Sequence, residues 1–223
     1  MSKFYEQFLK REFVTGMIFD VDGTLLDSMP VWAHSGERYL ATLGVHAPAS
    51  LGKTLFSLTM QQGAQYIKKT YGLSQTAEEI RAGIIRTVLE AYRKETGFKP
   101  SALDFLNTLR AAAIPMIVVT SNDKPLVEAA FERLGIRSYF KDILTCGDFG
   151  SGKDQPDIFY AAAERINSQV SGTWVAEDGL YAICTAKKAG FRTIGISDAS
   201  SRDDEADIRR LSDYFLFDYA DDV

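Results

Sequence analysis

Short apolar runs and longer amphipathic stretches alternate along most of the 223-residue chain. The apolar runs are rich in β-branched and aromatic residues and are too short for helices of typical length, so they predict buried strands. They are Val14–Phe19, Ile114–Thr120, Asp142–Cys146, Thr173–Ala176, Thr193–Ile196 and Tyr214–Phe217. The amphipathic stretches among them are Ala102–Ala112, Pro125–Leu134, Pro156–Ile166 and Ala182–Ala189. This alternation predicts an α/β fold with a Rossmann-like, doubly wound parallel sheet and helices on both faces.

One long interval, from Ser28 to about Phe98, contains no convincing strand. Its apolar positions recur at helical spacing, in Val31–Leu43, Leu55–Thr70 and Thr76–Lys94. A helical block between a first strand and the rest of a sheet indicates an inserted domain. We therefore expect a Rossmann-like core made of residues 1–27 and 98–223, and an all-helical cap domain made of residues 28–97.

Composition excludes several classes of protein. Lys and Arg total 25 against 30 Asp and Glu, a net charge of −5, whereas a nucleic-acid-binding protein needs a basic surface. The two cysteines, Cys146 and Cys184, form no CxxC pair, which argues against a disulfide framework or a zinc cluster. The N-terminal segment lacks the apolar core of a signal peptide, and no apolar run approaches the about 20 residues of a membrane span. We expect a cytoplasmic protein, a monomer or weak dimer, that binds neither nucleic acid nor membrane.

The first predicted strand leads directly into two carboxylates, Asp20 and Asp22, followed by Gly23 and Thr24. Sheets of parallel strands bind their ligands at the carboxyl ends of the strands. A calcium-binding loop also begins with an Asp-x-Asp pattern, but it requires a Glu at its twelfth position, where this chain has Val31. The segment is therefore predicted to serve a different chemistry.

Four motifs, in order along nearly the whole chain, resemble the haloacid dehalogenase-like phosphatase superfamily. They are an apolar strand ending in DxDGT (Ile18–Thr24), an apolar strand ending in Thr (Ile117–Thr120), a Lys in a GKxxPD setting (Gly152–Asp157) and an acidic pair that ends a strand (Val175–Asp178). Each motif alone is weak, but four in the expected order are specific. The resemblance is to the phosphatases and β-phosphoglucomutase-like proteins that carry a helical cap.

The resemblance implies a site for phosphoryl transfer. Asp20 would attack phosphorus and form an aspartyl-phosphate, and Asp22 would protonate the leaving alcohol and later deprotonate water. Mg2+ would be held by Asp20, the backbone carbonyl of Asp22 and Asp178, an all-oxygen set suited to a hard cation. Glu177 is either a further metal ligand or a neighbour of one.

Two motifs are assigned to the phosphate group. Thr120 would donate its hydroxyl to the phosphoryl oxygens, and Lys153 would supply a positive charge to the same group. Ser121 and Asn122, which follow Thr120, are candidates to share the phosphate.

These roles predict a Mg2+-dependent phosphatase that acts on a small phosphorylated metabolite. The alternative on the same fold is a sugar phosphomutase of the β-phosphoglucomutase type, but the cap stretch Leu55–Met60 is largely apolar. A signalling receiver module also has a phosphorylatable Asp, yet it lacks an acid two residues further on, as Asp22 is here. In the cap, Lys53, Gln61 and Gln62 are candidate specificity groups, and Trp32 either faces the substrate or packs in the cap core.

Overall fold

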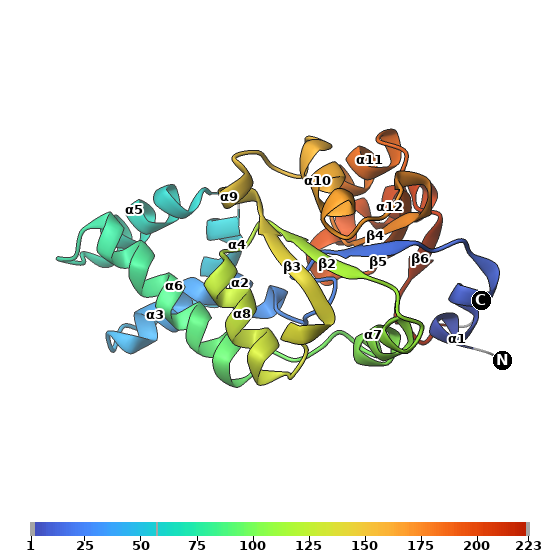
Figure 1. The fold of residues 1–223 in the computed structure, drawn as a ribbon. Helices are drawn as coiled ribbons and strands as arrows, with labels where there is room; N and C mark the ends of the chain where they lie inside the picture. The colour runs from blue at the N-terminus through green and yellow to red at the C-terminus, as the bar shows by residue number, and fades with distance from the viewer. Residues whose placement is uncertain (1–2, 57, 222–223) are drawn as a thin grey trace. The chain divides into compact units, whose positions relative to one another are not determined.

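In a computed structural model, six parallel strands form one sheet in the order β3-β2-β1-β4-β5-β6 (Figure 1). The structure describes residues 3–56 and 58–221. The strands are β1 (Gly16–Phe19), β2 (Met116–Thr120), β3 (Phe140–Thr145), β4 (Thr173–Glu177), β5 (Arg192–Ile196) and β6 (Tyr214–Leu216). Every residue of β1, β2 and β4 is buried, which explains why these segments are continuous apolar runs. The predicted α/β fold with a parallel sheet is confirmed.

Helices cover both faces of this sheet (Figure 1). They are α1 (Phe4–Arg11), α7 (Ala102–Ala111), α8 (Lys124–Arg133), α9 (Cys146–Phe149), α10 (Asp157–Arg165), α11 (Leu180–Lys188) and α12 (Glu205–Leu211), with the 3-10 turns η1 (Arg137–Tyr139), η2 (Val170–Gly172) and η3 (Ala199–Asp204). On one face, Ile18 and Ile117 pack with Phe159 of α10 in a buried cluster. On the other face, the ring of Phe19 contacts that of Phe105 in α7. The doubly wound arrangement thus places an apolar core on each side of the sheet.

Two boundaries of the predicted strands are wrong in an informative way. The third strand starts at Phe140 rather than Asp142, because the Phe140 ring stacks on Phe131 of α8. The same strand ends at Thr145 rather than Cys146, since the Thr145 side chain accepts a hydrogen bond from the backbone N–H of Asp148 (2.9 Å) and so caps α9.

The chain divides into two compact units, one of residues 1–27 and 97–223 and the other of residues 28–96. The two connections between them run side by side within the sheet-bearing unit. The backbone N–H of Asp27 donates to the carbonyl of Gly97 (3.0 Å), and Leu26 pairs with Phe98 in an antiparallel bridge. Gly97, which we expected as the last residue of the insertion, therefore belongs with the sheet.

The inserted unit contains α2 (Met29–Ala33), α3 (Ser35–Thr42), α4 (Leu51–Phe56), α5 (Met60–Tyr71) and α6 (Ala77–Lys94). The predicted helix Val31–Leu43 is two helices that meet at His34, where Gly52 of α4 packs directly against the carbonyl of Ala33. The predicted helix Leu55–Thr70 is also two, because Thr59 and Gln62 form a capping box that starts α5. Ser57, within this stretch, lies outside the described residues.

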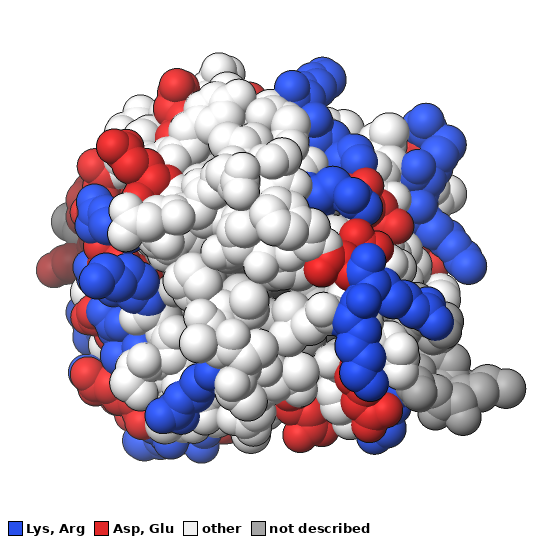
Figure 2. Space-filling model, turned by 45° about the vertical axis from the view of Figure 1, so that its right-hand side comes forward, with Lys and Arg blue, Asp and Glu red and all other residues white. Residues whose placement is uncertain are grey.

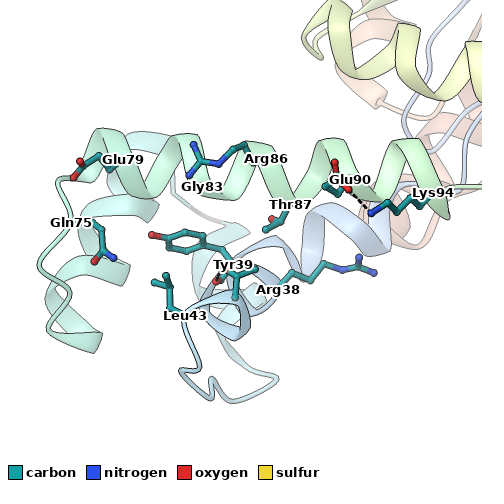
Figure 3. A pocket seen from close by; sticks show the side chains of 11 residues that line it. Arg38, Tyr39, Leu43, Gln75, Glu79, Gly83, Arg86, Thr87, Glu90 and Lys94 are labelled. Atoms are coloured by element: carbon teal, nitrogen blue, oxygen red, sulfur yellow. Dashed lines mark hydrogen bonds and ion pairs between the residues drawn. The ribbon is translucent and has the colours of Figure 1, made fainter.

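The core of the inserted unit holds α3 against α6. Tyr39 lies in a buried cluster with Ile67, Ile80 and Ile84, and its ring packs against Gly83, where an added Cβ would collide with it (Figure 3). A groove of about 700 Å3 runs along these two helices, with the Glu90–Lys94 ion pair at one end (2.6 Å; Figure 3). Trp32 donates its indole N–H to the Tyr92 hydroxyl (2.9 Å), also within this unit.

The surface agrees with the mixed charge of the sequence. Figure 2 shows basic and acidic side chains beside one another around a largely uncharged area, and among the described residues on this face the basic groups form no continuous surface. Within the described residues, no helix combines the length and the apolar composition that crossing a bilayer requires.

A polar cluster around Asp213 joins β5, α11 and the segment before β6. The Asp213 carboxylate accepts hydrogen bonds from Lys187 Nζ (2.9 Å) and from the backbone N–H of Thr193 (2.8 Å). Burial alone would raise the pKa of Asp213, but these two hydrogen bonds and the charges of Lys187 and Arg192 outweigh it and hold the pKa below its ordinary value. The ionised carboxylate is therefore the form that the fold stabilises.

We predict that Asp213→Asn lowers the free energy of unfolding by about 1–2 kcal/mol at pH 7, because it removes a charged acceptor from half-buried donors. The folded-state pKa lies below the unfolded one, so the stabilisation is present above about pH 4 and is lost as the pH falls through the lower folded value. Urea unfolding at pH 7 and at pH 3 should show a smaller difference at pH 3 than at pH 7. Asp203→Asn, at an exposed position of η3, is the matched control; a deficit as large as that of Asp213→Asn would refute the assignment.

Candidate active site

Three carboxylates gather where the strand order reverses. Asp20 directly follows β1, while Glu177 is the last residue of β4 and Asp178 the next one. Since β1 and β4 are neighbours, their carboxyl ends open onto the crevice that such sheets use for ligands. All three side chains are buried, and one oxygen of each lies within 4.8 Å of the others.

A lysine lies among these acids. Lys153, in the loop before α10, is 2% exposed, and its ammonium donates to Asp20 Oδ1 and to Glu177 Oε2 (2.7 Å). Burial would lower the pKa of Lys153, but the negative charges of Asp20 and Glu177 outweigh it and raise the pKa above its ordinary value. A buried ammonium is costly unless it is paired, so these contacts are what allow Lys153 to be there.

The three acids, Asp20, Glu177 and Asp178, outnumber the single positive charge of Lys153. Burial, with the charge of Asp20, raises the pKa of Glu177 to about 7, even though Lys153 pulls it down. Burial and the charges of Glu177 and Asp20 also raise the pKa of Asp178 well above its usual range. Three carboxylates face one ammonium, and oxygen is the donor that hard divalent cations prefer. The donor set therefore fits Mg2+.

Glu177 and Asp178 are both held by fixed donors. Glu177 Oε1 accepts from the backbone N–H groups of Asp178 (3.2 Å) and Gly179 (3.0 Å) at the start of α11. Asp178 Oδ1 accepts from the Thr24 hydroxyl (3.0 Å). Gly23 approaches the same carboxylate so closely that an added Cβ would lie 2.6 Å from Asp178 Oδ2, and its φ is +87°. The Gly23–Thr24 pair of the first motif is thus explained by Asp178, because Gly23 leaves room for that carboxylate and Thr24 donates a hydrogen bond to it.

The loop after β2 positions Asp22. The Asn122 side chain donates from Nδ2 to Asp22 Oδ2 (2.9 Å) and accepts at Oδ1 from the backbone N–H of Asp123 (2.8 Å). Thr120, the buried last residue of β2, accepts at Oγ1 from the backbone N–H of Asn122 (3.0 Å). Asn122, which we predicted to share the phosphate, therefore has its side-chain amide engaged in holding Asp22.

The structure brings the predicted site residues to one end of the sheet. Ser121 is the most exposed of them, and its hydroxyl lies 3.5 Å from Cys146 Sγ. Residues that the sequence did not indicate also contribute. They are Tyr219, whose buried hydroxyl donates to the Thr24 carbonyl (3.2 Å), Tyr181, whose pKa is raised by burial and by the charge of Glu177, and Ser201, described further below. All three reach the site through tertiary packing and belong to no motif, so the sequence carries no local signal for them.

Comparisons with known proteins agree with this geometry. The model of the family described as haloacid dehalogenase-like hydrolase matches residues 17–196. Phosphoglycolate phosphatase from Escherichia coli K12 is 28% identical over 211 residues, which cover 84% of this chain and 83% of that one. Phosphorylated carbohydrates phosphatase from Thermotoga maritima is 22% identical over 179 residues, covering 80% and 82%. The crystal structure of CbbY from Rhodobacter sphaeroides in complex with phosphate superposes with a TM-score of 0.74 at 21% identity, covering 93% of this chain and 96% of that one.

The chain therefore belongs to the haloacid dehalogenase-like hydrolase family. It is an enzyme of the phosphatase class, as the curated relatives over most of its length are.

We predict that Gly23→Ala destabilises the protein more than Gly135→Ala does. Both glycines have positive φ (+87° and +73°), so alanine is strained at each. At Gly135 nothing lies within 4 Å of the added Cβ, whereas at Gly23 it meets the Asp178 carboxylate, and overpacking adds about 1–3 kcal/mol. Urea unfolding of the two variants measures the difference; equal losses would show that Gly23 is required for its backbone conformation alone.

Proposed function

We propose that this enzyme is a Mg2+-dependent phosphatase that hydrolyses a small phosphomonoester through a phosphorylated Asp20. The observation that carries the proposal is the state of the Asp20 carboxylate. Its Oδ1 accepts a hydrogen bond from the Lys153 ammonium, while its Oδ2 accepts no hydrogen bond from the residues that the structure describes. An oxygen without a donor keeps its lone pairs for attack, and the neighbouring ammonium fixes the direction in which it points.

The proposed reaction has two displacements at phosphorus. In the first, Asp20 Oδ2 forms a bond to phosphorus as the bond to the ester oxygen breaks, and the leaving alcohol takes a proton from Asp22. In the second, water attacks the phosphorus of the aspartyl-phosphate and loses a proton to Asp22, while the bond to Asp20 breaks and inorganic phosphate leaves. The ester and one water become an alcohol and phosphate, and both aspartates return to their initial state.

Asp22 suits this acid and base role because its carboxylate is fixed in orientation and still accessible. It is half-buried, so a leaving group and a water molecule have access to it. Its Oδ2 is fixed by the Asn122 amide, which restricts the carboxylate to one orientation. We therefore assign Asn122 to the positioning of Asp22.

The negative charge of the phosphoryl group needs positive charge and donors around it. Lys153 uses two of its three N–H donors on Asp20 and Glu177, which leaves one for a phosphoryl oxygen. Thr120 accepts a hydrogen bond at its hydroxyl oxygen, and its own hydroxyl hydrogen is available to donate. Ser121 is a further candidate donor from the same loop.

Asp20, Glu177 and Asp178, with the backbone carbonyl of Asp22, are the groups that would hold Mg2+. When bound, the cation supplies positive charge to the phosphoryl oxygens and helps to orient the ester. Glu177 is the least direct of the four, because its Oε2 is paired with the Lys153 ammonium and its Oε1 accepts from two backbone N–H groups at the start of α11.

We assign the inserted helical unit, residues 28–96, to a cap that selects the substrate and excludes water during the reaction. Its two connections to the sheet-bearing unit meet at Asp27 and Gly97, directly after the segment that holds Asp20 and Asp22. Paired connections of this kind allow a unit to move as one body. The relatives named for phosphoglycolate and for phosphorylated carbohydrates make small phosphorylated acids and sugars the first substrates to examine.

We predict that Asp20→Asn abolishes phosphate release, because an amide is not a nucleophile toward phosphorus. Asp22→Asn should slow turnover by about 10²–10⁴-fold, the usual loss for a general acid and base. Steady-state phosphate release from small phosphomonoesters in Mg2+ measures both effects. Asp27→Asn, an exposed carboxylate in the same segment, is the matched control and should stay close to wild type. Substantial turnover by Asp20→Asn would identify a different nucleophile.

We also predict that the products are alcohol and inorganic phosphate rather than an isomerised sugar phosphate. A phosphomutase has to grip a second phosphate, and the stretch Leu55–Met60 carries no Lys or Arg with which to do so. Hexose 1-phosphates supplied with a trace of bisphosphate, with both products followed over time, test this directly. Hexose 6-phosphate forming much faster than inorganic phosphate would establish a phosphomutase instead.

A further inference from the structure

Asp178 has a second hydroxyl partner, from a part of the chain that no motif indicates. The Ser201 hydroxyl donates to Asp178 Oδ2 (3.1 Å), while Thr24 donates to Oδ1 of the same carboxylate. Ser201 lies in η3, the turn that follows β5. The buried carboxylate is therefore held from both sides, by the loop after β1 and by the turn after β5.

The turn that carries Ser201 is itself fixed by Asp198. The Asp198 carboxylate accepts at Oδ1 from the backbone N–H (2.9 Å) and the hydroxyl (2.7 Å) of Ser200. The backbone N–H of Ser201 donates to the Asp198 carbonyl (3.1 Å). These bonds form a side-chain cap on η3 and set the direction of the Ser201 hydroxyl.

Lys99 anchors Asp198 to the rest of the sheet-bearing unit. Its ammonium lies 2.9 Å from Asp198 Oδ2 and donates to the Ser197 carbonyl (2.9 Å). The Lys99 side chain is 12% exposed and that of Asp198 4% exposed, so solvent screens this ion pair far less than a surface pair. The backbone N–H of Lys99 donates to the Leu25 carbonyl (2.9 Å), which joins the pair to the segment that contains Thr24.

We propose that Ser201 is a positioning residue for the metal-binding carboxylate of Asp178, and that the Lys99–Asp198 ion pair holds its turn in place. The inference rests on the proposed function, in which Asp178 binds Mg2+. A carboxylate whose two oxygens are both oriented by hydroxyl donors loses little freedom when it binds a cation, and outer partners of this kind commonly change metal affinity by about 10–100-fold. Ser201 thus extends the metal site to residues well outside the four motifs.

The test is a Mg2+ titration of the full chain, freed of divalent cations, with the melting temperature as the readout. A ligand that binds only the folded state raises the melting temperature, and the rise grows with the logarithm of one plus the ratio of its concentration to its Kd. Ser201→Ala should require about tenfold more Mg2+ for the same rise. Ser201→Thr keeps the hydroxyl and should restore the wild-type requirement.

Ser138→Ala is the matched control, because it removes an exposed hydroxyl from a different 3-10 turn, η1. It should leave the Mg2+ requirement close to that of wild type. If wild type shows no response to Mg2+, the metal site of the proposed function is wrong. If wild type responds and Ser201→Ala responds equally, only the role of Ser201 is overturned. The melting temperature without Mg2+ reports on folding separately, and a loss confined to that value would make Ser201 purely structural.

Discussion

The burial of Lys153 between Asp20 and Glu177 is the interaction on which the site depends. An ammonium in this position would be strongly disfavoured alone, and two acids would repel each other without it. Together they hold Asp20 at the end of β1, with its Oδ1 hydrogen-bonded to Lys153 and its Oδ2 left for the phosphoryl group. Asp178 is a third carboxylate beside the single ammonium, and burial and the charges of Glu177 and Asp20 raise its pKa well above the usual range. This surplus of carboxylates is the physical basis for assigning a divalent cation to the site.

The parallel sheet makes this concentration of charge possible. Because β1 lies between β2 and β4, the residues that follow these three strands meet at one edge although they are far apart in the sequence. The strands themselves are fully buried and supply a rigid base, so the polar groups are confined to the loops. Thr24, Asn122 and Ser201 then orient individual carboxylate oxygens, each from a different loop.

The sequence predicts those parts of the site that need only a strand to place them. Asp20, Thr120 and Asp178 end or follow apolar runs, and buried strands leave a clear pattern. Partnerships between loops leave none, so the Asn122–Asp22 bond and the Ser201–Asp178 bond appear only in three dimensions. The same holds for the helix break at His34, which reflects the packing of Gly52 on Ala33. The break before α5 does have a local signal, the capping-box spacing of Thr59 and Gln62. A prediction from hydrophobic periodicity alone does not detect that signal.

The central claim is that Asp20 becomes covalently phosphorylated during turnover. The direct measurement is rapid acid quenching of the enzyme during turnover of a phosphomonoester, for wild type and for Asp22→Asn, followed by mass spectrometry of its peptides. Asp22→Asn should slow the hydrolysis of the intermediate, which lengthens its lifetime. The proposed mechanism predicts one phosphoryl group on the peptide that contains Asp20, and none in Asp20→Asn. A phosphoryl group on another residue, or turnover with none on the enzyme in either protein, would contradict it.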